Sequence, residues 1–189
     1  MRIVGGSARG RKLYIPDASP VRPTSERIKE ALFNIIDPVD GKCFLDLFAG
    51  TGNVGLEALS RGAAKAVFVE KDRILAGAIV KNVVSCRFSQ MAEILRADFN
   101  RALGTLAERF DSFDILFADP PYEAGCVGTV IAALEGGRLL AADGLLVVQH
   151  SFREAVRDGQ TGIVMTDQRS YGDTRLSFFQ KKLAREHAS

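Results

Sequence analysis

The sequence predicts a Rossmann-like, three-layer α/β/α fold with a mostly parallel sheet. Three observations support it: apolar runs alternate with helical patterns along residues 41–189, the first run leads into a glycine-rich turn, and the chain ends in two strand-like runs. Alternating strands and helices produce parallel strands joined by right-handed crossovers, with helices on both faces. The last two runs add an antiparallel C-terminal hairpin at one edge.

The chain begins with a short basic extension, residues 1–23, whose glycines and prolines suggest a hairpin or an extended strand followed by a loop. A leading helix is expected over residues 24–37. Ser25 can cap it, and Glu26 places a carboxylate in its first turn, where the helix dipole favours one. Asp37-Pro38 ends it, because a residue before proline is pushed out of the helical region. One apolar face is predicted from Ile28, Ala31, Leu32, Ile35 and Ile36.

The core follows in order. Strands are expected at Cys43–Leu47, Ala66–Val69, Ile94–Leu95, Phe113–Ala118 and Gly144–Gln149. Helices are expected around Leu56–Leu59, Asp72–Val84, Asn100–Ala107 and Val127–Leu134. The final strands, Gly162–Thr166 and Arg175–Gln180, flank a turn at Tyr171-Gly172-Asp173-Thr174. We expect one domain over 1–189, made of the arm (1–23), the helix (24–37) and a catalytic core (41–189).

Composition excludes several classes of protein. The chain has 189 residues, 47% hydrophobic and 25% charged, which excludes a disordered chain. No apolar run approaches the roughly 20 residues of a membrane span, and the N-terminus has no signal-peptide pattern. Three cysteines without a CxxC pair, and two histidines, favour reduced thiols and argue against a zinc site. We therefore expect a cytoplasmic protein with no metal.

Positive charge is concentrated at the N-terminus. The net charge is +2, yet residues 1–23 hold five Lys or Arg against one Asp, a local +4, which leaves −2 for the other 166 residues. A basic arm on a near-neutral body is typical of a phosphate-binding extension. A solvated tail explains the charge equally well at this point.

The glycine-rich turn suggests a nucleotide-containing cofactor. Gly50-x-Gly52-x-x-Gly55 follows the first strand, and Glu70 lies 20 residues after Gly50, where a ribose-binding carboxylate belongs. Glycines let the backbone approach a ligand closely, and the acid accepts from ribose hydroxyls. The pattern alone fits NAD and S-adenosylmethionine equally.

Two features favour S-adenosylmethionine. Asp46 ends the first strand, where its carboxylate would repel a pyrophosphate but attract the ammonium of a methionine moiety. Asp119-Pro120-Pro121-Tyr122 directly follows the fourth strand. Hydride transfer has no use for such a tetrapeptide, whereas methylation of a nucleobase amine does.

The amine needs this help because its lone pair is delocalised into the ring. The Asp119 carboxylate and the Pro120 carbonyl would accept from its hydrogens and stabilise the positive charge that develops on the nitrogen. Prolines fix the direction of that carbonyl and offer no competing N–H. Tyr122 offers a ring on which a splayed-out base can stack.

The chain resembles class I S-adenosylmethionine-dependent methyltransferases. More narrowly, it is similar to the bacterial family that methylates the N2 amine of one guanine in 16S rRNA. The glycine turn and the Asp-Pro-Pro-Tyr are superfamily-wide signals, and the N-terminal motifs carry the narrower assignment. The resemblance rests on Arg2–Gly6, Arg9–Leu13, Arg22-Pro23-Thr24, Arg27, Glu30–Asn34, Asp46–Gly55, Leu56–Ala63, Glu70-Lys71-Asp72 and Asp119–Tyr122.

The resemblance implies a role for each matched position. The target guanine would be handled by Asp119, Pro120, Pro121 and Tyr122. The cofactor would be held by Asp46, Phe48, Gly50, Thr51, Gly52, Glu70, Lys71, Asp98 and Phe99, with Asp98 reaching the adenine amine. For Asp98, a helix N-cap explains the residue equally well. The phosphates of 16S rRNA would be bound by Arg9, Arg11, Lys12 and Arg22.

Three alternatives stay open from the sequence. An adenine-N6 methyltransferase would use the same tetrapeptide, although no large DNA-recognition insertion is present. An NAD-dependent dehydrogenase would use the glycine turn but lacks an evident catalytic residue. A non-enzymatic RNA-binding module would use the basic arm but would not need Asp119. The partner implied by the resemblance is 16S rRNA in the small ribosomal subunit or its assembly intermediate. We also expect the protein to be a monomer. His150 is expected to be structural rather than a ligand-binding residue.

Overall fold

The computed structural model describes residues 1–17, 24–109, 112–121, 126–135, 137–154, 156 and 162–181. Two residues that the sequence assigns to the site, Arg22 and Tyr122, lie outside this range. The described elements confirm the predicted order of helices and strands.

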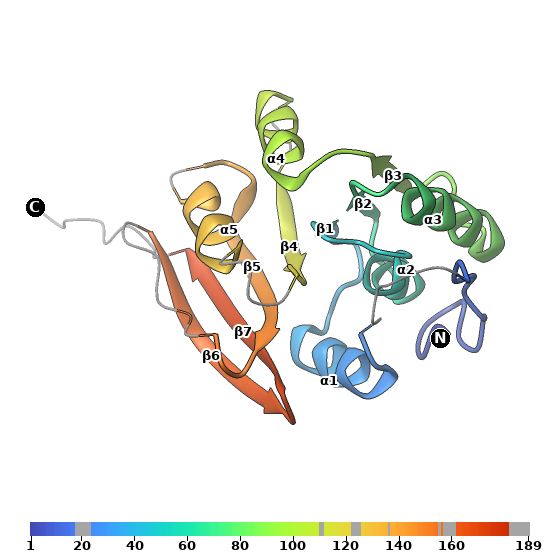
Figure 1. Cartoon of the computed structure of the whole chain (residues 1–189), viewed down its shortest axis with the longest axis horizontal. Helices are drawn as coiled ribbons and strands as arrows, with labels where there is room; N and C mark the ends of the chain where they lie inside the picture. Colours follow the sequence, from blue (N-terminus) through green and yellow to red (C-terminus); the bar gives the residue numbers. More distant parts are fainter. Residues whose placement is uncertain are drawn as a thin grey trace, which may run out of the picture.

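The described strands form one seven-stranded sheet in the order β3-β2-β1-β4-β5-β7-β6 (Figure 1). The strands are β1 (Cys43–Asp46), β2 (Lys65–Val69), β3 (Ala92–Leu95), β4 (Phe113–Ala118), β5 (Leu140–Ser151), β6 (Ile163–Tyr171) and β7 (Thr174–Lys181). Strands β1 to β5 pair in parallel, and β7 pairs antiparallel with both β5 and β6. The order reverses between β1 and β4, and ligands of such sheets bind beyond the carboxyl ends of the strands at that point.

The helices cover both faces of the sheet, as the fold class requires. Three pack on one face: α1 (Glu26–Ile36), α2 (Asn53–Ser60) and α3 (Arg73–Cys86). Two pack on the other: α4 (Phe99–Glu108) and α5 (Cys126–Leu134). Ser25 caps α1 by accepting from the N–H of Ile28, as its position predicts. Each face therefore has its own apolar layer against the central strands.

The last three strands are longer than the sequence predicts. β5 begins at Leu140 rather than Gly144, and β6 and β7 run up to a two-residue turn at Gly172-Asp173. Gly172 adopts a positive φ of 62°, which the tight turn requires. β6 is an edge strand, and most of its residues are exposed or half-exposed. Its polar second half therefore lacks the alternation of apolar and polar residues from which a strand is predicted.

The described part of the basic arm is a hairpin packed onto the core, not a solvated tail. Ile3 donates its N–H to the Arg11 carbonyl at 3.0 Å, and Gly10 donates to the Ile3 carbonyl at 2.9 Å. Ile3 and Leu13 are buried in the same apolar cluster as α1, α2 and α3. The hairpin prediction is confirmed for these residues, and the solvated tail is excluded for them.

A buried ion pair fastens the hairpin to α1 and α2. Lys29 Nζ and Glu57 Oε2 lie 3.0 Å apart, and both side chains are fully buried. Glu57 also accepts from the N–H groups of Val4 and Gly5, at 2.9 and 2.7 Å. Lys29 also donates to the Arg2 carbonyl and to the Asn53 side chain, at 2.7 Å each. The sequence pattern does not reveal this pair, because lysine and glutamate side chains are usually exposed.

Candidate active site

The glycine turn between β1 and α2 forms a tight backbone cradle. Gly50 and Gly52 have positive φ values of 56° and 84°, which L side chains rarely adopt. Gly55, in the first turn of α2, lies against the Phe68 ring, and a Cβ at this position would overlap that ring. All three glycines of the predicted motif therefore serve the shape of the turn and its packing on the sheet.

Asp46 sits at the carboxyl end of β1, beneath this turn, and is 1% exposed. Its carboxylate accepts from the Gly55 N–H at 3.1 Å. Burial raises the pKa of Asp46 to about 7, against the lowering effect of the Gly55 N–H, while Asp119 and Glu70 raise it further. A buried carboxylate suits a positively charged ligand, because the positive charge of the ligand favours the ionised form of the acid.

Glu70 closes the cradle from the end of β2. Its Oε2 accepts from the Gly50 N–H at 2.9 Å, and its Oε1 accepts from the Asp72 N–H at 2.8 Å. Burial raises its pKa, and both N–H contacts oppose the rise. The structure therefore brings Asp46, the glycine turn and Glu70 together as predicted, while the neighbouring Lys71 is exposed.

Two aromatic rings lie beside the turn. The centroids of Phe48 and Phe99 are 5.2 Å apart, with the rings tilted by 43°. Asp98 precedes Phe99 and caps α4, with its Oδ1 accepting from the Asn100 N–H at 3.0 Å. The helix-cap explanation of Asp98 is thus confirmed, and its role toward adenine stays a prediction.

This donor set fits S-adenosylmethionine. The cradle offers a buried acid for a cationic methionine end, a second acid for ribose hydroxyls, and a pair of rings for a flat base. A pyrophosphate would instead bring its negative charge against Asp46, at a large electrostatic cost.

Asp119 lies at the carboxyl end of β4, next to β1 in the sheet. Its Oδ2 accepts from Gln149 Nε2 at 2.9 Å and from Thr24 Oγ1 at 3.4 Å. Burial raises the pKa of Asp119 to about 7, although both hydrogen bonds lower it. Pro120 is buried and Pro121 is exposed.

A cavity of about 40 Å³ joins the two halves of the site. Its lining includes Asp46 and the glycine turn from the cofactor side, and Asp119 and Thr24 from the tetrapeptide side. The electrostatic effect of Asp119 on the pKa of Asp46 also reflects their closeness. This is where a methyl donor held by the cradle and an amine held by Asp119 would meet.

Two partners of Asp119 were not predicted. Thr24 belongs to the Arg22-Pro23-Thr24 motif, and only its place in this motif could have indicated a role in the site. Gln149 is a polar residue at the end of an apolar run, near the carboxyl end of β5, and only that position could have suggested it. Asn53 extends the set: its Nδ2 donates to the Thr24 carbonyl at 3.0 Å, and its Oδ1 accepts from Lys29.

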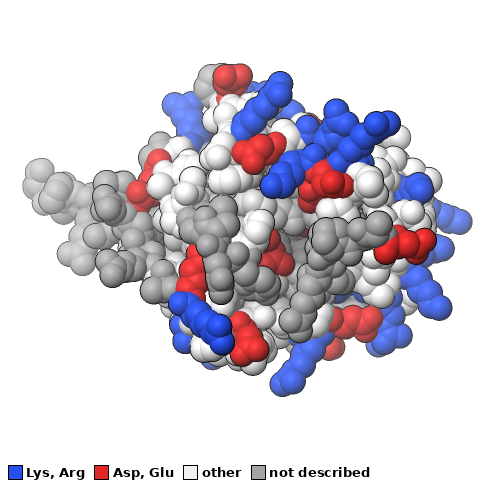
Figure 2. Space-filling model, viewed as in Figure 1, with Lys and Arg blue, Asp and Glu red and all other residues white. Residues whose placement is uncertain are grey.

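The basic residues of the arm lie elsewhere. Arg9, Arg11 and Lys12 are exposed, and Figure 2 shows many Lys and Arg side chains on the side where Figure 1 places the arm. The hairpin tip is fixed to the C-terminal end of α2, where Ser7 donates to the Ser60 carbonyl at 2.7 Å. Because α2 begins at the glycine turn, its other end points away from the catalytic edge of the sheet. The structure therefore does not bring these cations next to Asp119.

His150 is a structural residue, as expected. It is 1% exposed, with Nε2 at 2.8 Å from Ser177 Oγ and Nδ1 at 2.9 Å from the Ser151 carbonyl. Burial lowers its pKa. It faces the α5 side of the sheet, away from Gln149.

Comparisons with known proteins agree with this geometry. The protein-family model described as "Conserved hypothetical protein 95" matches residues 1–180. The chain belongs to this family. It is 41% identical over 151 residues to ribosomal RNA small subunit methyltransferase D of Escherichia coli K12, covering 79% of this chain and 74% of that protein. The protein of the same name from Haemophilus influenzae is 36% identical over 155 residues, covering 79% and 78%.

Solved structures show the same fold. A hypothetical protein of Thermus thermophilus, TTHA0928, superposes with a TM-score of 0.82 at 32% identity, covering 95% of this chain and 99% of that one. TrmN from the same species gives a TM-score of 0.65 at 22% identity, covering 82% of this chain and 48% of that one, which supports the fold alone. These comparisons confirm the predicted fold and the predicted methyltransferase class. They argue against the alternative of an NAD-dependent dehydrogenase.

Two further properties concern the described residues. Among them, no helix is long and apolar enough to cross a membrane. The same residues contain no group of three or more His, Cys, Asp or Glu side chains that would hold a metal ion.

Proposed function

We propose that this protein transfers a methyl group from S-adenosylmethionine to the exocyclic N2 amine of one guanine in 16S rRNA. The observation that carries the proposal is the position of Asp119, which shares one small cavity with Asp46 and the glycine turn. An acid at the end of β4, followed by two prolines, suits an amine acceptor that faces a methyl donor.

The cofactor supplies a methyl group on a positively charged sulfur. The protein's residues bind and orient the two reactants, which provides much of the rate enhancement for a transfer between two bound molecules. Asp46 and Glu70, both held by backbone N–H groups, fix the cofactor side. Asp119 and the Pro120 carbonyl accept from the two amine hydrogens and stabilise the charge that grows on nitrogen.

Gln149 and Thr24 keep Asp119 in position for this task. Both donate to the same oxygen, Oδ2, so Oδ1 is left for the amine. With a pKa of about 7, Asp119 is able to take the proton that the amine loses after transfer.

The rRNA substrate is supported by the relatives, whose names describe methyltransferases of small-subunit ribosomal RNA. We further propose that the protein acts as a monomer in the cytoplasm, on the small subunit or its assembly intermediate. A chain of 20.5 kDa contacts only a local patch of RNA, which favours a loop presented by a folded particle over a long extended site.

The test is methyl transfer from labelled S-adenosylmethionine to small ribosomal subunits purified from cells that lack this enzyme. Nucleoside analysis of the digested 16S rRNA is expected to reveal N2-methylguanosine at one site. N6-methyladenosine would overturn the base assignment and keep the mechanism. Incorporation into neither small subunits nor naked 16S rRNA, with cofactor binding intact, would overturn the substrate.

A further inference from the structure

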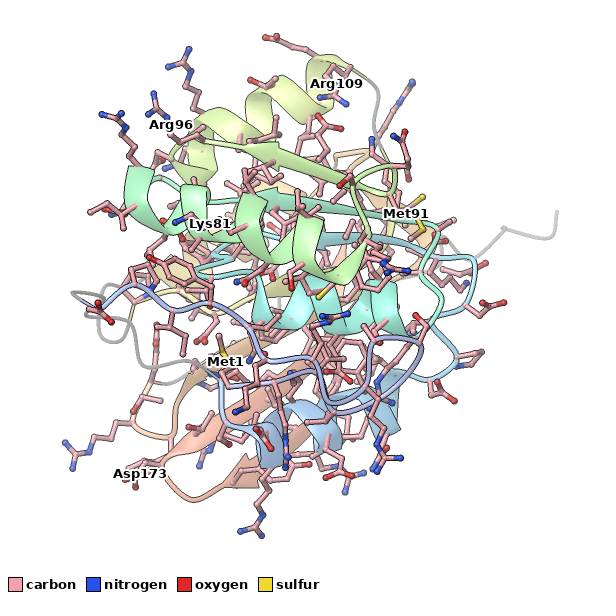
Figure 3. The ribbon with its side chains drawn as sticks, turned by 90° about the vertical axis from the view of Figure 1, so that its right-hand side faces the viewer. Met1, Lys81, Met91, Arg96, Arg109 and Asp173 are labelled. Carbon is pink, nitrogen blue, oxygen red and sulfur yellow. The ribbon has the colours of Figure 1, made fainter. Side chains whose placement is uncertain are left out.

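A groove of about 710 Å³ opens on the face of the sheet that α1 covers. It lies between the first turn of α1, the end of β5 and the β6–β7 turn. Figure 3 shows that turn, marked by Asp173, beside α1 at the foot of the molecule, as Figure 1 also does. This volume lies within the range of small-ligand pockets, about 300–1,000 Å³, and is sufficient for a nucleotide and part of its neighbour.

Two residues of the groove contact the catalytic acid. Thr24 lines both this groove and the small cavity beneath the glycine turn, and it donates to Asp119. Gln149 also lines the groove while donating to the same Asp119 oxygen. A chain of nucleotides in the groove would therefore reach the reacting position at its inner end.

Gln149 has an unused hydrogen-bond acceptor. The residue is 3% exposed, and among the described residues its Oε1 has no hydrogen-bond partner. Nε2 donates to Asp119, which is the orientation that the ionised carboxylate favours, and this leaves Oε1 facing away from that acid. A buried carbonyl without a donor is costly, and such groups usually serve a ligand or a mechanism.

Guanine carries the donor that this oxygen lacks. Its N1–H lies next to the N2 amine, so a base whose amine meets Asp119 presents N1–H to a neighbouring acceptor. Adenine has a lone pair at N1 beside its own amine, and that lone pair would repel Oε1. The pair of contacts thus distinguishes guanine from adenine by a buried hydrogen bond, which is an effective means of discrimination.

The outer part of the groove has the chemistry of an RNA surface. Arg27, at the start of α1, and Arg153, after β5, are both accessible to solvent, and Asp173 is the one acid among the described lining residues. Phe152 is 40% exposed, with the Arg153 guanidinium 5.5 Å from its ring centroid. Arginines bind phosphates, and an exposed ring beside an arginine is a stacking platform for an unpaired base.

We propose that this groove binds the single-stranded RNA segment that carries the target guanine. Gln149 Oε1 accepts from the guanine N1–H and selects this base, while Arg27, Phe152 and Arg153 hold the adjacent nucleotides. The proposal rests on the proposed function. It requires Oε1, closed off from water here, to open onto the groove when the base enters.

The groove is tested first by binding. The double variant Arg27→Ala/Arg153→Ala and the single variant Phe152→Ala are compared with Arg101→Ala, an exposed arginine on α4 across the sheet. Affinity for an unmodified RNA stem-loop that contains the target guanine is measured over a series of salt concentrations. The arginine variant is expected to bind at least about tenfold more weakly, and the salt slope is expected to fall by about 1.4, since each lost single-strand phosphate contact removes about 0.7.

Phe152→Ala is expected to weaken binding without changing the slope, and Arg101→Ala to change neither. Unchanged affinity and slope in the groove variants would overturn the groove assignment. This binding readout is independent of catalysis. Absence of N2-methylguanosine with the wild-type enzyme would overturn the proposed function, whereas intact methylation with unaffected RNA binding by the groove variants would overturn only this inference.

The selection by Gln149 is tested with RNA carrying 2-aminopurine at the target position. This base keeps the N2 amine but has a lone pair in place of N1–H. The wild type is expected to prefer guanine in kcat/KM by at least about tenfold, and Gln149→Leu to reduce that preference at least about fivefold. The ratio of the two substrates cancels any general loss of rate caused by disturbing Asp119. An equal preference in wild type and variant would overturn the selection by Gln149.

Discussion

The cofactor side and the substrate side of the catalytic cavity are built in different ways. On the cofactor side, Asp46 and Glu70 are held by backbone N–H groups within one short stretch, Gly50 to Asp72. On the substrate side, Asp119 is held by the side chains of Thr24 and Gln149, 95 and 30 residues away in the sequence. A local backbone cradle tolerates change around it, whereas a site assembled from distant side chains depends on the packing of the whole fold.

The largest effect is expected from Asp119→Asn. The amide keeps the size of the side chain but replaces a charged acceptor, so kcat for methyl transfer should fall at least about 1,000-fold, on the scale of lost electrostatic stabilisation. Cofactor affinity, measured by calorimetry, should stay within severalfold, because the cradle does not depend on this residue. Near-normal kcat would contradict the assignment of Asp119 as the acceptor.

Asp46→Asn should have the opposite profile. Loss of its charge is expected to weaken S-adenosylmethionine binding about tenfold or more, since the ligand's cation no longer meets an anion. Measured at saturating cofactor, kcat should fall much less than in Asp119→Asn. If both variants lost kcat and cofactor affinity equally, the division of the site into two sides would be wrong.

The same substitution should stabilise the protein without cofactor. The folded-state pKa of Asp46 is raised to about 7, above the usual unfolded value of about 3.9 for Asp. The folded state therefore binds more protons than the unfolded state between these values, and wild-type stability falls as pH rises from about 4 to 7. Thermal unfolding of Asp46→Asn should show a smaller decline over this window and a gain of about 1–3 kcal/mol at pH 8. Parallel pH profiles for the two proteins would contradict the raised pKa.

The smallest effect is expected from the arm. Replacing Arg9, Arg11 and Lys12 by alanine should weaken RNA binding and flatten its salt dependence, because three exposed cations are removed. The loss should be smaller than that of the groove variants, since the hairpin tip is fixed at the far end of α2. Filter binding at two salt concentrations compares the RNA affinities of the arm and groove variants. A larger loss of affinity in the arm variant would make the arm the principal RNA contact.

The same contrast explains what could be predicted from the sequence. The cradle was predictable because Gly50, Gly52, Gly55 and Glu70 form a contiguous pattern with a known backbone purpose. The positions of Asp46 and Asp119 at the ends of strands were predictable from the alternation of apolar runs and helical patterns alone. Gln149 was missed because its contact with Asp119 depends on the pairing of β5 with β4, which no local pattern records.

Lys29 shows the other reason for a failed prediction. Its neighbours in α1 predict an amphipathic helix, and a lysine there is expected in water. Its burial arises from partners outside the helix: Arg2, Asn53 and Glu57. Buried ion pairs of this kind are determined by tertiary packing and are invisible to periodicity.

The Lys29–Glu57 pair makes the N-terminal residues an integral part of the enzyme. A shortened chain beginning after Leu13 would leave the Glu57 carboxylate buried without the N–H groups of Val4 and Gly5. A shift of α2 would also displace Asn53, which donates to the Thr24 carbonyl. Thr24 in turn donates to Asp119, so the catalytic acid would lose part of its support. The arm therefore cannot be exchanged between proteins as a detachable RNA-binding tag, because removing it would dismantle the catalytic centre.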